Sequence, residues 1–138
     1  MAMADAPRIL VVDDDAAVRR LFETVLSEDG YYVTVAASGR EAVAALHNTV
    51  FDVIVLDMSL RDMDGLGLLR EIRVEFPLSR ALATSGFMES PRKGLARRAG
   101  AAAILAKPIR ASILQAAVYG LLDPSGSCQS TDPAGPAD

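Results

Sequence analysis

Five short runs of apolar, mostly β-branched residues recur along the chain and predict the strands of a sheet. The first and third runs are continuous and do not alternate with polar residues, which is typical of parallel strands covered on both faces. The fourth and fifth are rich in alanine and, taken alone, could also belong to helices. The predicted strands cover residues 8–12, 31–36, 51–56, 80–84 and 102–106.

The segments between these runs carry apolar residues at three- and four-residue spacing, the period of a helix with one buried face. Ser38 and Ser90 are candidate N-caps. Pro77 ends the third helix, and Gly100 ends the fourth. The predicted helices cover residues 16–28, 38–47, 65–75, 90–99 and 111–122.

Strands and helices therefore alternate five times, an order that favours a parallel sheet with helices on both faces. Crossovers between parallel strands are right-handed, and five strands suit the order 2-1-3-4-5. We expect an α/β fold of three layers, built on a doubly wound five-stranded parallel sheet. The ends of the chain have little to bury, so we expect an N-terminal extension (1–7), one domain (8–122) and a disordered tail or linker (123–138).

Composition narrows the class of protein. The 138 residues are 51% hydrophobic and 23% charged, as in ordinary globular domains. A net charge of −4 and 5% aromatic residues without tryptophan argue against direct nucleic-acid binding. No apolar run approaches the roughly 20 residues of a membrane helix, and the first residues lack an export signal. We therefore expect a cytoplasmic protein without membrane insertion.

Carboxylates follow two strands that the expected order places side by side. Asp13 and Asp14 follow the first strand, and Asp57 follows the third. Ligands of open parallel sheets bind beyond the carboxyl ends of the strands, where the strand order reverses. Three carboxylates in one crevice repel each other unless a hard cation binds them, and Mg²⁺ suits such oxygen ligands best.

Two more polar side chains belong to the same edge of the sheet. The fourth strand ends at Thr84, and the fifth is followed by Lys107, one of only two lysines. A metal ion and an ammonium group neutralise phosphoryl oxygens while a carboxylate attacks the phosphorus. This set of groups therefore indicates phosphoryl transfer.

The motifs VVDDD, VLD, MDG, TSG and KP, in this order at successive strand ends, resemble the receiver domain of two-component response regulators. The resemblance covers about residues 8–122 and implies the flavodoxin-like receiver fold. It implies that Asp57 accepts a phosphoryl group from a histidine kinase or a histidine phosphotransfer protein. It also implies Mg²⁺ bound by Asp14, Asp57 and the backbone carbonyl of Ser59, with Asp13 holding the ion through water.

The resemblance further implies a phosphorylation switch. Thr84 would turn its hydroxyl to the phosphoryl group, Lys107 would pair with it, and Pro108 would follow a cis peptide bond. Phosphorylation would remodel the face formed by the fourth helix, fifth strand and fifth helix, where a downstream protein binds. The chain would be no enzyme beyond its own phosphorylation from a phosphodonor and its autodephosphorylation.

The sequence departs from the family pattern at several positions. Ile104 stands three residues before the lysine, where the family often has the aromatic residue that follows the switch hydroxyl. Leu60 and Arg61 stand where Met-Pro is usual. Ser59 and Gly86 are small, so we expect that water can reach a phosphorylated acceptor and hydrolyse it.

Two other functions remain open. The chain could be a pseudo-receiver that binds proteins without being phosphorylated. It could also be a small aspartyl-nucleophile phosphatase, although that class has a second aspartate where Ser59 stands. The sequence is compatible with a stand-alone regulator, a receiver of a hybrid kinase, or the first part of a longer regulator.

The remaining acids of the two clusters have structural interpretations. Asp15 is the better candidate for capping the first helix, because carboxylates favour a helix start. Asp62 and Asp64 are expected to shape their loop and to cap the helix that follows.

Overall fold

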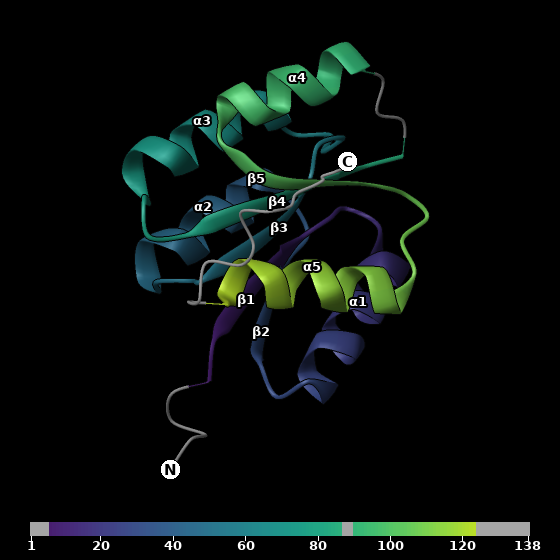
Figure 1. Cartoon of the computed structure of the whole chain (residues 1–138). Helices are drawn as coiled ribbons and strands as arrows, with labels where there is room; N and C mark the ends of the chain where they lie inside the picture. The colour runs from purple at the N-terminus through teal and green to yellow at the C-terminus, as the bar shows by residue number, and fades with distance from the viewer. Residues whose placement is uncertain (1–5, 87–89, 124–138) are drawn as a thin grey trace.

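The structure, a computed structural model, describes residues 6–86 and 90–123, with the backbone alone at 90–93. Strands and helices alternate through this part of the chain (Figure 1). All strand pairs are parallel, and the sheet order is β2-β1-β3-β4-β5, as expected from the sequence. The elements are β1 Arg8–Val12, α1 Ala16–Glu28, β2 Tyr32–Ala36, α2 Gly39–Asn48, β3 Val53–Asp57, α3 Gly65–Glu75, β4 Arg80–Ser85, α4 Ser90–Ala99, β5 Ala101–Ala106 and α5 Ala111–Leu122.

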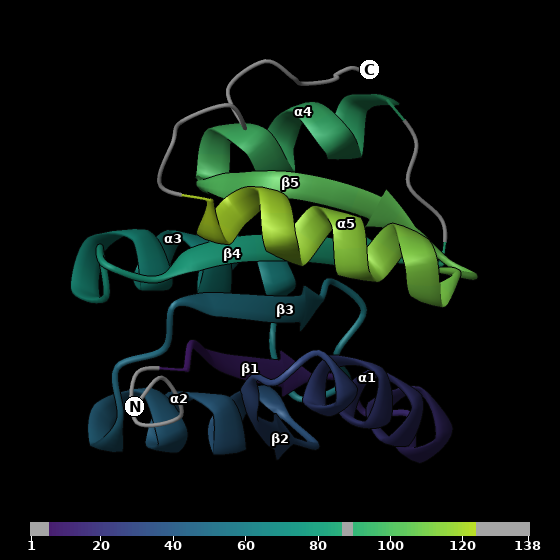
Figure 2. The same cartoon turned by 60° about the horizontal axis from the view of Figure 1, so that its bottom comes forward.

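The sheet is the middle of three layers, with α1 and α5 on one face and α2, α3 and α4 on the other (Figure 2). Side chains of β3 alternate between the two cores: Val53 and Val55 pack with α1 and α5, and Ile54 and Leu56 pack with the other helices. Every residue of β3 is buried, as its continuous apolar run predicted. Full burial of each large apolar side chain stabilises the fold by about 1.5–3 kcal/mol. The carboxyl ends of the central strands are therefore fixed in position by the core.

Three helix starts are capped as expected. Asp15 Oδ1 accepts the N–H of Ala17 at 2.9 Å, and Ser38 Oγ accepts the N–H of Glu41 at 3.1 Å. Asp64 Oδ1 accepts the N–H of Leu66 at 3.2 Å. Each bond satisfies a backbone donor that the first turn of a helix leaves unpaired.

Asp62 does not cap the helix that follows it, so that prediction was wrong. Its two carboxylate oxygens accept the N–H groups of Gly39 at 2.9 Å and Arg40 at 3.0 Å, at the start of α2. These two donors lower the pKa of the Asp62 carboxyl below its ordinary value. The loop after β3 is thereby tied to a helix more than twenty residues earlier in the chain.

Most predicted boundaries agree with the structure, and the others differ by one or two residues. β3 begins at Val53 and not at Phe51, although Phe51 is buried, and it runs on to Asp57 because that residue pairs with Thr84 of β4. Ser90 belongs to α4 and does not precede it. Gly100 has φ +118° and ends α4 as predicted, so β5 starts directly after it.

No helix among the residues that the structure describes is long and apolar enough to cross a membrane. The expected tail, residues 124–138 with Cys128, lies outside the described residues.

Candidate functional site

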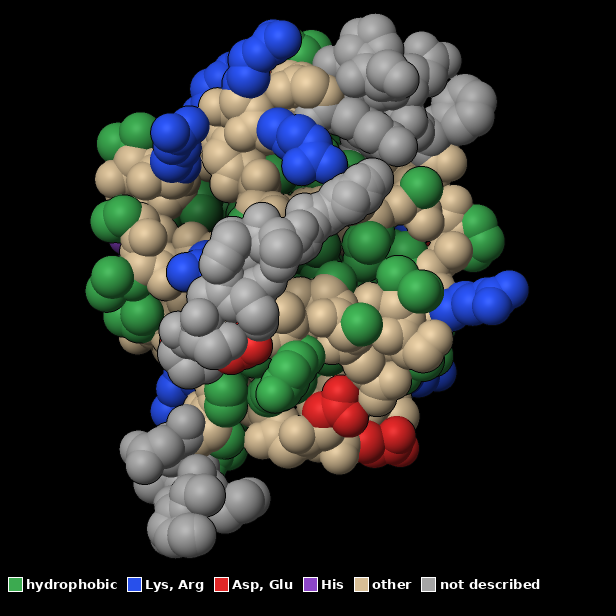
Figure 3. All heavy atoms as spheres, in the orientation of Figure 1, with side chains coloured by type: hydrophobic (Ala, Val, Ile, Leu, Met, Phe, Trp, Pro, Cys, Tyr) green, Lys and Arg blue, Asp and Glu red, His purple; other side chains and the backbone are tan. Residues whose placement is uncertain are grey.

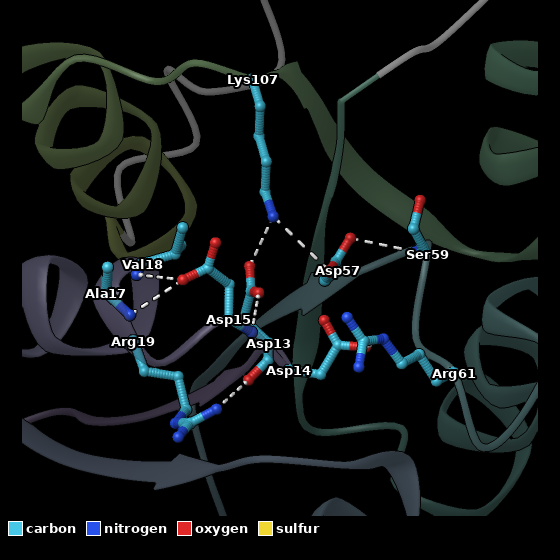
Figure 4. A network of polar contacts seen from close by, with 10 residues as sticks. All are labelled: Asp13, Asp14, Asp15, Ala17, Val18, Arg19, Asp57, Ser59, Arg61 and Lys107. Carbon is cyan, nitrogen blue, oxygen red and sulfur yellow. Dashed lines mark hydrogen bonds and ion pairs between the residues drawn. The ribbon is translucent and has the colours of Figure 1, made fainter.

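The carboxyl ends of β1 and β3 bring three carboxylates together (Figure 4). Asp13, Asp14 and Asp57 each offer an oxygen, and these oxygens lie within 4.8 Å of one another. The exposed fraction is 1% for Asp13 and 3% for Asp57, whereas Asp14 is half-buried. The sequence predicted this cluster from two strands that are adjacent in space and distant along the chain.

Backbone N–H groups orient the two buried carboxylates. Asp13 Oδ1 accepts the N–H of Asp15 at 2.9 Å, and Asp57 Oδ1 accepts the N–H of Ser59 at 3.0 Å. Arg19 Nη1 donates to the backbone carbonyl oxygen of Asp13 at 2.8 Å, which fixes the turn after β1 to helix α1. One oxygen of Asp13 and one of Asp57 are thus held, and the other oxygen of each remains for a cation.

Lys107 is that cation. Its Nζ lies 2.6 Å from Asp13 Oδ2 and 3.5 Å from Asp57 Oδ2. The backbone positions the side chain, because the N–H of Lys107 donates to the carbonyl of Ser85 at 2.7 Å. The peptide bond between Lys107 and Pro108 is cis. The expected cis peptide is therefore present.

Burial and charge act against each other at this site. Burial raises the pKa of the Asp57 carboxyl and the charge of Asp13 adds to this, whereas the N–H of Ser59 and the ammonium of Lys107 oppose it. Burial alone would lower the pKa of Lys107, but its bonds to Asp13 and the charge of Asp57 outweigh burial and raise it. The charged lysine and the acidic cluster therefore stabilise each other.

Two buried side-chain oxygens in the described part of the chain have no hydrogen-bond partner, Asp14 Oδ2 and Thr84 Oγ1. Arg61 Nε approaches Asp14 Oδ2 at 3.7 Å, which is an ion pair but too long for a hydrogen bond. Thr84 is 1% exposed and is the register partner of Asp57, so their side chains share one face of the sheet. Buried polar atoms without partners are unusual in folded proteins, and both belong to this edge.

These atoms fit a hard divalent cation. Three carboxylates with an unpartnered oxygen on Asp14 supply the oxygen ligands that Mg²⁺ prefers, and the single ammonium of Lys107 neutralises only part of their charge. Asp57, Asp14, Lys107 and Asp13 are therefore brought together as predicted, with Thr84 and Ser59 beside them.

The positions that depart from the family pattern have clear places in the structure. Ile104 pairs in register with Ala83 and packs against the core of α2, α3 and α4, on the face opposite to Thr84. Ser59 and Gly86 are exposed, and a Cβ built on Gly86 would meet no atom within 4 Å. The surface around Asp57 is therefore open at both small residues.

Sequence reasoning missed three contacts: Arg19 on the Asp13 carbonyl, Arg61 beside Asp14, and Asp62 on α2. Arg61 was noted only as a departure from a proline. Its partner, Asp14, lies in the turn after β1, far away along the chain, so the position of Arg61 in the sequence carried no information about the ion pair.

A family model described as the response regulator receiver domain matches residues 9–119 of this chain. The chain is 38% identical over 101 residues to the alginate biosynthesis transcriptional regulatory protein AlgB of Pseudomonas aeruginosa, covering 73% of this chain and 22% of that protein. It is 32% identical over 126 residues to the transcriptional regulatory protein ZraR of Escherichia coli K12, covering 91% of this chain and 29% of that protein. The chain thus spans less than a third of the length of these relatives.

Solved structures share the fold over nearly the whole described chain. A CheY-like response regulator receiver domain protein from Methanospirillum hungatei has a TM-score of 0.82 and 30% identity, over 86% of this chain and 94% of that one. A BeF3-activated DrrB receiver domain has a TM-score of 0.79 and 26% identity, over 85% and 97%.

Proposed function

This chain belongs to the family of response regulator receiver domains, and on that premise we propose that it accepts a phosphoryl group on Asp57 in a two-component phosphorelay. One observation carries the proposal: the buried carboxylate of Asp57 lies between the Lys107 ammonium and two further carboxylates at the carboxyl edge of the sheet. Receiver domains are signalling modules, and this one acts as a switch and not as an enzyme on other substrates.

Asp57 is the acceptor. The donor is a phosphohistidine of a histidine kinase or a histidine phosphotransfer protein. One oxygen of Asp57 forms the new bond to phosphorus, the N–P bond of the donor breaks, and its electron pair stays on the histidine ring. The Ser59 N–H holds Asp57 Oδ1 at 3.0 Å, and Oδ2 faces the ammonium of Lys107 at 3.5 Å. Lys107 neutralises charge on the phosphoryl oxygens.

Mg²⁺ would be held by Asp14, Asp57 and the backbone carbonyl of Ser59, with Asp13 holding it through water. The unpartnered Oδ2 of Asp14 and the carboxylate cluster support this ligand set. When bound, the ion supplies positive charge that offsets the charge of the phosphoryl group. Asp13 also orients Lys107, because its Oδ2 accepts the shortest bond of that ammonium, at 2.6 Å.

Thr84 is the switch residue. Its buried hydroxyl has no partner, so a phosphoryl oxygen on the neighbouring Asp57 would satisfy it. Ile104 offers no aromatic ring to follow that hydroxyl, and it already packs in the core beneath α4. Switching therefore proceeds through the end of β4 that carries Thr84 and the loop that carries Lys107, as a shift between two packings of these segments.

The α4–β5–α5 face is the proposed binding surface for a downstream protein. Arg97 and Arg98 lie in the last turn of α4, and Leu95 of α4 and Ile113 of α5 are 38% and 49% exposed. Figure 3 shows basic side chains over α4 in the upper part of this view and acidic ones in the lower part. A face with exposed apolar residues beside basic ones suits an acidic, partly apolar protein surface and not nucleic acid.

The receiver domain extends over residues 8–122, between an N-terminal extension (1–7) and a tail or linker (123–138), in a cytoplasmic protein. Exposed Ser59 and Gly86 leave room for water beside the acceptor, so autodephosphorylation is not sterically blocked. A very long-lived phosphoryl group in Mg²⁺ would contradict this part of the proposal.

Phosphorylation with acetyl phosphate and Mg²⁺ tests the function. Wild type should gain one phosphoryl group by intact-mass measurement and should bind beryllofluoride, the reagent named for the similar DrrB structure. Asp57→Asn should lose both responses. Asp52→Asn is the matched control, because it makes the same change at the other end of β3 and should respond like wild type.

A response that persists in Asp57→Asn would overturn the assignment of the acceptor. A wild type that never responds would instead be a pseudo-receiver that only binds proteins. Turnover of a phosphate ester in Mg²⁺ would identify a phosphatase.

A further inference from the structure

Two cationic side chains divide the three carboxylates of the site unequally. Lys107 contacts Asp13 and Asp57, whereas Asp14 is left to Arg61, whose Nε lies 3.7 Å from Asp14 Oδ2 (Figure 4). The Arg61 side chain is 92% exposed and makes no other ion pair among the described residues. Its one contact with a carboxylate is thus with the oxygen that lacks a hydrogen bond.

The backbone on both sides of Arg61 is anchored. Leu60 is 8% exposed and packs in the core, and Asp62 is bonded to the first two N–H groups of α2. Further along the loop, a Cβ added to Gly65 would lie 2.8 Å from the backbone oxygen of Met58, so the loop also closes tightly on itself. Arg61 is therefore held beside Asp14 by its neighbours, and only its side chain can move away.

We propose that Arg61 is a built-in counter-ion of Asp14 that weakens divalent-cation binding and so sets the Mg²⁺ concentration at which the site loads. The inference rests on the proposed metal site. With Arg61 in place, three carboxylates face two cationic side chains and one negative charge is uncompensated. Without Arg61 two negative charges are uncompensated, and the site attracts a dication more strongly.

The expected size is modest, because water and salt screen a side chain that is almost fully exposed. Removal of the charge should lower the Mg²⁺ dissociation constant roughly two- to fivefold at low ionic strength. The difference should shrink as monovalent salt rises to about 1 M, where the screening length of about 3 Å is shorter than the 3.7 Å between the two groups.

Titration calorimetry with MgCl₂ on four full-length proteins tests the proposal: wild type, Arg61→Gln, Arg61→Lys and Arg70→Gln. Arg61→Gln should bind Mg²⁺ more tightly than wild type, and Arg61→Lys should stay near wild type because it keeps the charge. Arg70 is exposed on α3 and is the matched control for net charge. Arg70→Gln should bind like wild type.

A second measurement follows Arg61 itself. The ¹⁵Nε resonance of Arg61 should shift during the wild-type titration with the same midpoint as the heat, because the metal displaces it from Asp14. Equal affinity of Arg61→Gln and Arg70→Gln, or weaker binding by Arg61→Gln, would overturn the counter-ion role. Absence of Mg²⁺ binding in wild type would instead overturn the proposed metal site, so the two failures are distinguishable.

Discussion

Asp52 and Asp57 stand at the two ends of the same strand and have opposite environments. Asp52, just before β3, is exposed, and its Oδ2 accepts the N–H of Arg8 at 2.9 Å. Its own backbone N–H donates to the carbonyl of Arg8 at 2.8 Å, so the residue completes the pairing of β1 with β3. Asp57, at the other end, is 3% exposed and lies beside two further carboxylates.

The difference shows which acidic residues stabilise the fold and which ones lower its stability because they are buried close to other carboxylates. At the amino end, the carboxylate of Asp52 accepts a backbone N–H and stays in contact with water, so its charge costs no desolvation energy. At the carboxyl end, carboxylates are removed from water and repel each other, and burial raises the pKa of Asp57. Lys107 holds this cluster together in the absence of a bound dication.

Removal of the lysine should have the largest effect on stability. Lys107→Ala leaves Asp13 and Asp57 buried without their cation, and it should lower the free energy of unfolding by about 2 kcal/mol in metal-free buffer. Urea denaturation checks this. Combining Asp13→Asn with Lys107→Met should recover part of the loss, because one of the two buried carboxylate charges then disappears together with the lysine. A loss below about 0.5 kcal/mol would mean that Lys107 does not hold the cluster together.

Neutralising the acceptor should stabilise the metal-free protein. Asp57→Asn should raise the free energy of unfolding at pH 7 by about 1 kcal/mol, the usual scale of a single substitution, because burial and the charge of Asp13 disfavour the charged carboxylate. Asp52→Asn should change it by less than about 0.5 kcal/mol, because the amide oxygen still accepts the N–H of Arg8.

The pH dependence has a definite sign. Because the folded-state pKa of Asp57 is raised, the folded protein holds this proton more strongly than the unfolded chain. The contribution of Asp57 to stability should therefore fall as the pH rises above the ordinary aspartate range of about 4. Asp57→Asn should lack that part of the decline, and an identical decline in both proteins would refute the assignment. Thermal unfolding across this pH range measures it.

Ser79→Ala probes the amino end of the sheet. Ser79 Oγ donates to the carbonyl of Phe51 at 2.5 Å, and its loss should cost about 0.5–1 kcal/mol in a denaturation experiment. Acetyl phosphate should still modify this variant at the wild-type rate, because the bond lies at the opposite end of β3 from Asp57. A slower rate would show that the two ends are coupled.

Substitution of Asp62 should have the smallest effect on stability. Asp62 follows the carboxyl end of β3, as the buried carboxylates do, but like Asp52 it accepts hydrogen bonds from backbone N–H groups. The N–H groups of Gly39 and Arg40 depress its pKa, so its contribution is present above about pH 4 and is lost as the pH falls through the lower folded-state value. In a plot of the free energy of unfolding against pH, Asp62→Asn should slightly reduce the loss of stability below about pH 4. A loss identical to that of wild type would show that these bonds contribute nothing, and Asp52→Asn controls for net charge.

Much of the fold could be predicted from the sequence because the hydrophobic pattern within each segment indicates whether it forms a strand or a helix. The run Arg8–Val12 and the helices Ala16–Glu28, Gly65–Glu75 and Ala111–Leu122 have the predicted bounds. Hydrophobic period alone did not settle which side chains are covered: Leu21 has the spacing of a buried residue in α1 but is 49% exposed. The edge of a helical stripe is buried only where another element reaches it.

The sequence by itself determined the alternation of strands and helices, the parallel order and the meeting of Asp13, Asp14 and Asp57, because strand ends in a parallel sheet share one edge. Only the tertiary structure decided the partner of each charged group. Asp62 bonds to α2, Arg61 approaches Asp14, and Lys107 is nearer to Asp13 than to Asp57. Those choices depend on distances of a few ångströms between segments far apart in the chain, and hydrophobic pattern carries no information at that scale.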